Sequence, residues 1–524
     1  MARLRTGKRR RLPIRVGNDV TGLVLVGTAL VVLTWLIWLA LVVALGRWTA
    51  VFVARTAPLD KVWRASLWWG FAWLTLVVLG ASLLLSMGSS QAALIISSLS
   101  VLFGVGSLIF RRSEIPRWAK PQPPVLALLV AIGLATLYLA FKVLGPISNY
   151  DSGLYHLGSV KYAYDFAAIP GIASLYFPFG YASAQFPMAA LLGNGPWEGS
   201  GYRLLNGAVV LLVVADIFSR LLNRRWTWGT CTLVFGVSAA FIPLVAMADG
   251  IVTSPTADTT VLILTLMSAV YLADFIEKRS TASSLDLSTA LVLSMVAVAY
   301  RPTMIIFALS TLLVGAYLIA HRRPHTSALV APLGNVLAVT SLLAIVVLLR
   351  DRLLSGWVAY PLSLFQFNVD WAAPDPTHWR DATLAAARDP GSNDGFVTAH
   401  SFNWVVSWIE RLPQQWEFWF FMTGFIVLVA AAVLMKARNV YRPPLIELLT
   451  ALIPSSVAVI AWFVFSPPSF RFIWGPLFLL LFLPLGWILN QFARQGLETQ
   501  GLMRLSLGTL IACSLAVASV TAYS

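Results

Sequence analysis

Long runs of apolar residues, separated by short polar connections, recur along the whole chain. A helix needs about 20 apolar residues to cross a hydrocarbon core of ~30 Å, and most of these runs approach or exceed that length. They do not alternate like barrel strands, and lipid offers the backbone no hydrogen-bond partner, so we expect helices. The predicted spans are 20–45, 66–87, 91–110, 124–144, 203–219, 229–247, 257–276, 286–300, 302–320, 327–349, 415–435, 445–465, 472–490 and 502–520.

Composition supports this reading. Hydrophobic residues make up 58% of the 524-residue chain and charged residues only 11%, whereas soluble domains carry about 25% charge. The two cysteines, Cys231 and Cys513, lie inside apolar runs and show no metal-ligand spacing. We therefore predict an all-α polytopic membrane protein with about 13–14 transmembrane helices.

The positions of the basic residues predict a topology. Cytoplasmic loops are enriched in Lys and Arg, and the net charge of +15 is concentrated in alternate short connections. The connections between them, including the long loops 145–202 and 350–414, should then face outward. Any site formed by these two loops would then lie on the extracytoplasmic face. The connections predicted to be cytoplasmic are 46–65, 111–123, 220–228, 277–285, 321–326 and 436–444.

The N-terminal tail, residues 1–19, disagrees with this topology. It is strongly basic and should be cytoplasmic, yet counting back through three spans places it outside. Either the segment 20–45 lies in the interface without crossing, or the tail is exported. A polybasic arm lying on anionic lipid is the simpler interpretation. No aromatic residues are interleaved with its arginines, which argues against nucleic-acid binding.

The two long loops differ in composition. Loop 145–202 is rich in Tyr, Phe, Pro and Gly, a mixture that suits short helices in the lipid headgroup layer. Loop 350–414 combines several tryptophans with acids. Aromatic rings and carboxylates together are typical of sugar sites, and also of ordinary lumenal loops. Both interpretations of loop 350–414 stay open.

Five short motifs are spread between residues 150 and 472: YDSGLYH at 150–156, IPG at 169–171, SPTAD at 254–258, LSGW at 354–357 with YP at 360–361, and SPPSFRF at 466–472. They resemble those of a known group of enzymes, the GT-C superfamily of polytopic glycosyltransferases that use polyprenyl-phosphate sugars. The chain most closely resembles an uncharacterised bacterial branch of GT-C-like integral membrane proteins. The resemblance implies a core at 124–490, preceded by accessory helices at 20–123 and followed by a C-terminal helix within 491–524. The accessory helices depart from the simplest GT-C arrangement. The resemblance to a bacterial branch also implies a plasma-membrane protein with its site on the extracytoplasmic face.

Two acids in these motifs are candidates for catalysis. By resemblance, Asp151 matches the catalytic acid of the first outer loop in GT-C enzymes, where it would take the acceptor hydroxyl proton. The alternative is that Asp151 only caps the following turn. Asp258 resembles a second acidic position near the outer membrane face. It could bind a divalent cation, orient the acceptor or cap its own helix, although Thr256 or Ser254 could do the capping instead.

Two arginines are candidates for binding the donor phosphate. Arg301 lies between two short apolar segments, and Arg471 follows the helix-breaking residues 466–468. A charge at the bilayer centre costs about 2.5–3.5 kcal/mol on insertion scales, so such residues usually have a use. A guanidinium matches phosphate oxygens two at a time. The alternative is that each side chain only extends to the membrane interface.

Tyr155, His156 and Lys161 follow Asp151 and are predicted to support the site. His156 together with Asp151 and Asp258 could hold Mg²⁺ or Mn²⁺, but the spacing does not require a metal, and no cofactor can be assigned from it.

Three function classes compete. The first is a glycosyltransferase that moves a sugar from a polyprenyl-phosphate donor to a glycan or lipid acceptor, and the resemblance implies that it inverts the anomeric configuration. The second is a lipid-linked glycan polymerase, ligase or flippase without sugar-transfer chemistry of its own. The third is a transporter, which would place charge near the midplane and show repeated halves. Here the charge lies at the outer rim and no repeat is detectable. An acid at the position of Asp151 suits proton abstraction, and we therefore expect a transferase.

Overall fold

The computed structural model describes residues 16–53, 59–110, 123–223, 226–246, 248–277, 284–322, 326–440 and 444–495. In this part of the chain the regular structure is helical, and the only β pairing is an isolated bridge between Trp357 and Gln366. Eleven of the described helices are long and apolar enough to cross a membrane. The protein is a multi-pass, all-α integral membrane protein, as its apolar pattern predicts.

Every apolar segment predicted between residues 20 and 490 forms a helix. The predicted span 502–520 and the first 15 residues of the basic tail lie outside the described residues. The long helices are α1 (Val16–Val53), α2 (Leu59–Ser82), α3 (Ser90–Phe110), α4 (Pro123–Lys142), α7 (Leu204–Leu222), α8 (Trp228–Ala246), α10 (Asp258–Glu277), α11 (Ser284–Tyr300), α12 (Ile305–Arg322), α13 (Thr326–Ser355), α17 (Trp416–Ala437), α18 (Leu445–Phe465) and α19 (Trp474–Arg494).

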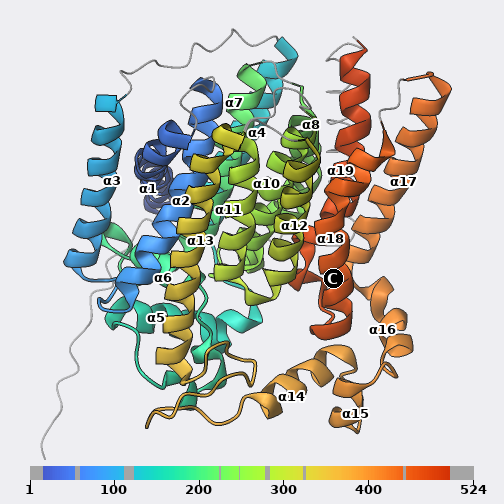
Figure 1. Cartoon of the computed structure of the whole chain (residues 1–524). Helices are drawn as coiled ribbons and strands as arrows, with labels where there is room; N and C mark the ends of the chain where they lie inside the picture. The colour runs from blue at the N-terminus through green and yellow to red at the C-terminus, as the bar shows by residue number, and fades with distance from the viewer. Residues whose placement is uncertain are drawn as a thin grey trace, which may run out of the picture.

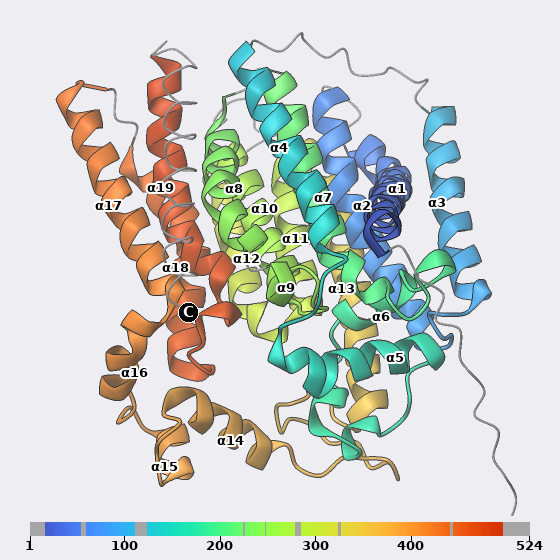
Figure 2. The ribbon, with the colours of Figure 1, turned by 180° about the vertical axis from the view of Figure 1, so that it is seen from behind.

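Most of these helices run up and down the bundle, but α1 does not. Figures 1 and 2 show α1 nearly end-on, so it lies across the directions of its neighbours. It crosses α2 where two glycines meet, because a Cβ built on Gly46 would fall 2.3 Å from the backbone nitrogen of Gly70. Segment 20–45, which disagrees with the charge-based topology, therefore lies in the helix whose direction differs from that of the other long helices.

Helix α10 forms the centre of the bundle. Its apolar stretch is completely buried, and the helix packs against α7, α8, α11, α18 and α19. Small residues allow close contact around it: a Cβ on Gly486 of α19 would lie 2.1 Å from Thr232 Oγ1 of α8. In contrast, α3, α4 and α17 are mostly exposed in this structure and present apolar surfaces at the periphery. The charged residues at both ends of α10 are consequently held in fixed, protein-lined surroundings.

One end of the bundle carries both long loops, and we name it the loop end. The first loop contains η1 (Ser152–His156), α5 (Leu157–Asp165), η2 (Ile172–Ser174), η3 (Phe177–Gly180), α6 (Gln185–Leu191), η4 (Gly195–Trp197) and η5 (Gly201–Arg203). The second contains α14 (Thr377–Arg388), α15 (Gly395–His400), α16 (Val405–Arg411) and η7 (Leu412–Gln414). Short helices were expected in the first loop, and the structure has them.

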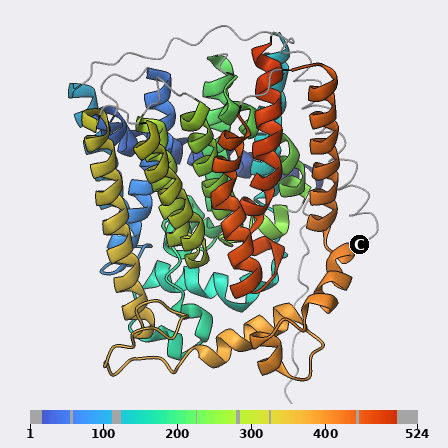
Figure 3. The ribbon, with the colours of Figure 1, turned by 45° about the vertical axis from the view of Figure 1, so that its right-hand side comes forward.

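The second loop forms a strap, residues 356–415, that runs beneath the bundle from α13 to α17 (Figure 3). Tyr360 ties it to the first loop by donating to the carbonyl of Phe177 at 3.1 Å. At the other side, the Trp408 indole donates to the carbonyl of Pro468 at 3.0 Å. The strap is therefore attached to two of the loop-end segments that carry predicted site residues.

The opposite end of the bundle holds buried ion pairs that sequence patterns did not reveal. Lys61 and Arg64 fall in the predicted loop 46–65, but α2 begins at Leu59, and both side chains are buried. Lys61 Nζ lies 3.2 Å from Asp286 Oδ2. The predicted loop boundary is wrong here because the charges that suggested a loop are neutralised inside the bundle. Likewise α13 extends to Ser355, into the predicted loop 350–414.

Candidate functional site

The two predicted acids and the two predicted arginines meet at the loop end. Asp151 Oδ2 lies 2.6 Å from an Arg471 Nη2 nitrogen, and Asp258 forms a direct ion pair with Arg301. Arg301 Nη1 also donates to the backbone carbonyl of Arg471 at 3.2 Å, which joins the two pairs. Both guanidinium groups lie over the ring of Phe472, at 5.1 and 5.0 Å from its centroid. We name Asp151, Asp258, Arg301 and Arg471 the ion-pair cluster.

Helix-breaking residues place the arginines. Arg301 precedes Pro302 and adopts an extended backbone (φ −147°, ψ 108°), as expected of a residue before proline. Helix α11 therefore ends at Tyr300, and the Arg301 side chain leaves the helix. Residues 466–468 similarly end α18, and the chain forms the short turn η8 (Phe470–Phe472) before α19 begins. Arg471 lies on that turn.

The two acids do not act as caps. Asp151 immediately precedes η1, but its side chain makes no capping hydrogen bond. At the start of α10, Thr256 Oγ1 accepts a bond from the Asp258 backbone N–H at 3.3 Å and donates to Asp258 Oδ2 at 2.7 Å. Thr256 thus forms the local hydrogen bonds at the start of α10, which was one of the alternatives that the sequence left open. Both carboxylates are left to pair with arginines from distant parts of the chain.

Burial is graded across the ion-pair cluster. The Asp258 side chain is 4% exposed and Arg301 15%, whereas Asp151 is 19% and Arg471 34% exposed. Burial acts to lower the pKa of Arg471, but the neighbouring Asp258 and Asp151 carboxylates outweigh it and raise that pKa. Arg471 therefore stays charged, and the Asp151–Arg471 pair is the more accessible half of the site.

Tyr155 and His156 form the wall beside the acids. Burial, with further contributions from Tyr181, Asp151 and Asp258, raises the pKa of Tyr155, so its hydroxyl remains protonated. Burial lowers the pKa of His156 to about 4 despite the nearby carboxylates. The imidazole is therefore neutral near pH 7. As predicted, both residues lie at the site.

His156 faces hydroxyl groups as well as charges. Its Nδ1 lies 3.3 Å from Ser152 Oγ, which is in turn 2.6 Å from Ser254 Oγ. This series of hydrogen bonds links the first loop to the segment before α10. Among the described residues, no group of three or more His, Cys, Asp and Glu side chains is arranged to hold a metal ion. Asp151 and Asp258 each face an arginine, and the predicted metal set with His156 is not assembled.

Lys161 is not part of the site. It lies on α5, is 77% exposed, and pairs with Asp165 one helical turn away at 2.7 Å. Its spacing from His156 did not require a shared face, and the structure shows that the two side chains face different surroundings.

Two further residues belong to the site. Glu417, at the start of α17, is buried, accepts a hydrogen bond from the Trp474 indole at 3.0 Å, and lies close enough to Arg471 for the arginine's charge to affect it. Phe472 supports both guanidinium groups. An acid at the head of an apolar run was the available signal for Glu417. Phe472 lies in the 466–472 motif, but its ring contacts follow only from the fold.

The ion-pair cluster contains two anionic and two cationic side chains, so it is balanced when nothing is bound. An incoming anion with several oxygens can take the guanidinium groups, because arginine forms paired hydrogen bonds with such groups. The carboxylates would then lose their partners. Asp151, the more accessible acid, would become a stronger proton acceptor.

Comparison with known proteins places the chain in a family. A family model described as a domain of unknown function (DUF8201) matches residues 29–478. Searches of curated proteins and of solved structures found no match. The matched region contains every residue of the ion-pair cluster and extends over most of the chain. The protein therefore belongs to the DUF8201 family.

Proposed function

We propose that the protein is a membrane glycosyltransferase that moves a sugar from a polyprenyl-phosphate-linked donor to a glycan or lipid acceptor. The observation that carries this proposal is the ion-pair cluster, in which two acids face two arginines at the end of an apolar bundle. By the distribution of basic residues, this end faces away from the cytoplasm, and the resemblance implies a bacterial plasma membrane. The resemblance to GT-C enzymes agrees with both assignments.

The arginines bind the donor phosphate. Arg471 is partly exposed and meets the phosphate first, and Arg301 reaches it from behind through the contact that already joins the two residues. Negative charge grows on the phosphate as the sugar–oxygen bond breaks. Fixed cationic donors in a water-poor site stabilise that charge. The leaving group is the polyprenyl phosphate.

Asp151 is the general base. Once the phosphate has taken Arg471, the Asp151 carboxylate accepts the proton of the acceptor hydroxyl while that oxygen bonds to the anomeric carbon. The acceptor oxygen replaces the phosphate oxygen from the opposite side, so the anomeric configuration inverts. Asp258 is more deeply buried and holds Arg301 in place. Its role is to position the arginine.

Sugar transfer from radiolabelled polyprenyl-phosphate sugars tests the proposal in membranes that contain either the wild type or Asp151→Asn. This nearly isosteric change should lower transfer by about 10²–10⁴-fold, the usual contribution of a general base. Asp165→Asn is the matched control, because Asp165 lies in the same loop but pairs with the exposed Lys161. It should retain wild-type transfer.

The outcomes separate the possible functions. Wild type that binds the donor lipid but transfers no sugar would point to a flippase, or to another protein that only binds the lipid carrier. Transfer that survives Asp151→Asn would exclude Asp151 as the base. Arg471→Lys should keep donor binding better than Arg471→Gln, because lysine retains the charge but not the paired donors.

A further inference from the structure

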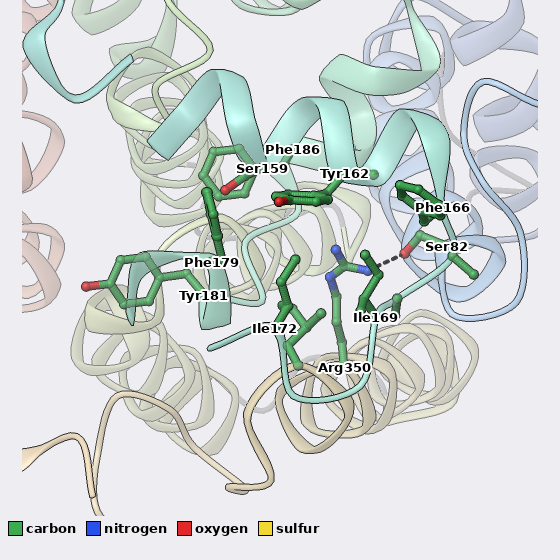
Figure 4. A pocket seen from close by; sticks show the side chains of 14 residues that line it. Ser82, Ser159, Tyr162, Phe166, Ile169, Ile172, Phe179, Tyr181, Phe186 and Arg350 are labelled. Carbon is green, nitrogen blue, oxygen red and sulfur yellow. Dashed lines mark hydrogen bonds between the residues drawn. The ribbon is translucent and has the colours of Figure 1, made fainter. Parts of the chain in front are cut away.

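A pocket at the loop end contains an arginine that the proposed mechanism does not use. It lies between the end of α2, helix α5, the segment that follows α5 and the end of α13 (Figure 4). Arg350 projects into it from α13, with aromatic rings around it. A buried cation that lines a pocket suggests that the pocket binds an anion.

Arg350 is held but not neutralised. Its side chain belongs to a residue only 6% exposed, and Nη1 donates to Ser82 Oγ at 2.8 Å. Nε has no hydrogen-bond partner. Asp351, the next residue, influences Arg350 electrostatically, but it receives a hydrogen bond from the Ala182 backbone. Within the described part of the chain, no carboxylate forms an ion pair with Arg350. A buried charge left in this state is costly unless a ligand completes it.

The side of the Arg350 guanidinium that has no protein partner indicates which charged group the ligand carries. Ser82 occupies Nη1, which leaves the fork formed by Nε and Nη2. This fork matches the two oxygens of a carboxylate in a bidentate arrangement. A single cation also balances a singly charged anion better than a doubly charged phosphate. The Ser159 hydroxyl, which lines the same pocket, is buried without a partner and can contribute one more hydrogen bond.

The walls and the size define the rest of the ligand. The cavity encloses about 20 Å³, which is room for one small polar group and not for a whole ring. A carboxylate can enter, while the body of the ligand stays at the mouth. Phe166 is 53% exposed there, and the rings of Phe179 and Tyr181 line the same space (Figure 4). Flat aromatic surfaces of this kind suit the apolar face of a sugar.

The pocket shares a wall with the ion-pair cluster. Tyr181 and Phe186 line the pocket, and their ring centroids lie 6.0 and 6.2 Å from that of Tyr155. Tyr155 in turn lies close enough to Asp151 and Asp258 for both charges to affect it. The rings of Tyr181 and Tyr155 therefore connect the pocket with the surroundings of the predicted base.

We propose that the Arg350 pocket binds the carboxylate of an acidic sugar, a hexuronate, and so selects an acidic glycan as acceptor. This assignment rests on the proposed function for its place in the reaction, but the binding itself does not require sugar transfer. Arg350 is then a specificity-determining residue, and Ser159 supports it.

Direct binding tests the proposal. Purified full-length protein in detergent is titrated calorimetrically with methyl glucuronide and with methyl glucoside, which differ only in the carboxylate. Wild type should bind the glucuronide at least about tenfold more tightly, and Arg350→Gln should remove that preference. Arg352→Gln is the matched control, because Arg352 lies two residues away on α13 and stacks on Phe367 at 4.6 Å. It should bind like wild type. Equal affinity for the two sugars, or no binding of the glucuronide, would overturn the proposal.

Two further variants guard against misfolding of Arg350→Gln. Arg350→Lys keeps the charge and loses the fork, and it should bind the glucuronide more weakly than wild type. Ser159→Leu fills the pocket without touching the arginine, and unchanged binding in this variant would also refute the site. Asp151→Asn should lower transfer by about 10²–10⁴-fold but leave glucuronide binding intact. Loss of transfer and loss of binding are thereby separated, so either proposal can fail alone.

Discussion

Replacing Arg220 by methionine should destabilise the bundle by about 3–5 kcal/mol, because it removes the buried cation that two buried carboxylates share. Arg220 lies on α7 at the end opposite the loop end and is 1% exposed. Its Nε is 2.5 Å from Asp216 Oδ1, and its Nη1 is 2.7 Å from Asp274 Oδ2. Both acids are almost completely buried.

The magnitude follows from what remains after the change. Asp216 still accepts hydrogen bonds from the Trp68 indole and the Tyr271 hydroxyl, each at 2.8 Å. These neutral donors do not replace a positive charge. Methionine fills a similar volume, so the loss comes from electrostatics and not from a cavity. A triple variant that also carries Asp216→Asn and Asp274→Asn removes the buried charge and should recover part of the stability.

Equilibrium unfolding in mixed micelles, followed by tryptophan fluorescence, measures these differences. The matched control is Arg494→Met, because Arg494 pairs with Glu277 at the same end but is 51% exposed. That change should cost less than about 1 kcal/mol. Two results would contradict this prediction: an Arg220→Met variant that loses no more unfolding free energy than the control, or a triple variant that is less stable than the single one.

Three other changes test the packing and the site. Gly486→Ala should lower the unfolding free energy by about 1–3 kcal/mol, because its Cβ would lie 2.5 Å from the Thr232 backbone nitrogen, whereas Gly133→Ala meets nothing within 4 Å and should not destabilise. Burial lowers the pKa of His156 from 6.5 to about 4, so stability should be retained above pH 6.5 and lost as the pH falls toward 4; thermal unfolding across that range should show a flatter dependence in His156→Gln. Trp408→Ala should cost about 3–5 kcal/mol and increase proteolysis of the strap, because the indole is buried against Phe463 and Phe470.

The sequence predicted the helices well because lipid leaves few alternatives for a long apolar run. It failed where charges suggested loops. Lys61 resembles a cytoplasmic loop residue, and only its contact with Asp286, on another helix, explains why it is buried. Arg350 follows an apolar run, and the sequence predicts that a loop begins there, although α13 continues past it to Ser355. Partners of this kind lie too far away along the chain for local patterns to identify them.

The candidate site was predictable as a set of residues but not as a geometry. Charges beside apolar segments drew attention to Asp151, Asp258, Arg301 and Arg471, and the fold brings all four together. Which acid pairs with which arginine depends on how α10, α11 and α18 are arranged. Lys161 is also a charged residue of the first loop and was predicted to support the site, yet the direction of α5 leaves its side chain exposed.

The pairing of Asp151 with Arg471 has a consequence for how the protein is made. About 320 residues separate the two, and a ribosome adds roughly 5–20 residues per second, so Asp151 waits tens of seconds for its partner. Asp258 waits a much shorter time for Arg301. A chain released before residue 471 would leave Asp151 without its counter-ion at the rim of the bundle. Closure of this pair therefore marks a nascent chain in which the turn after α18 has reached the loop end.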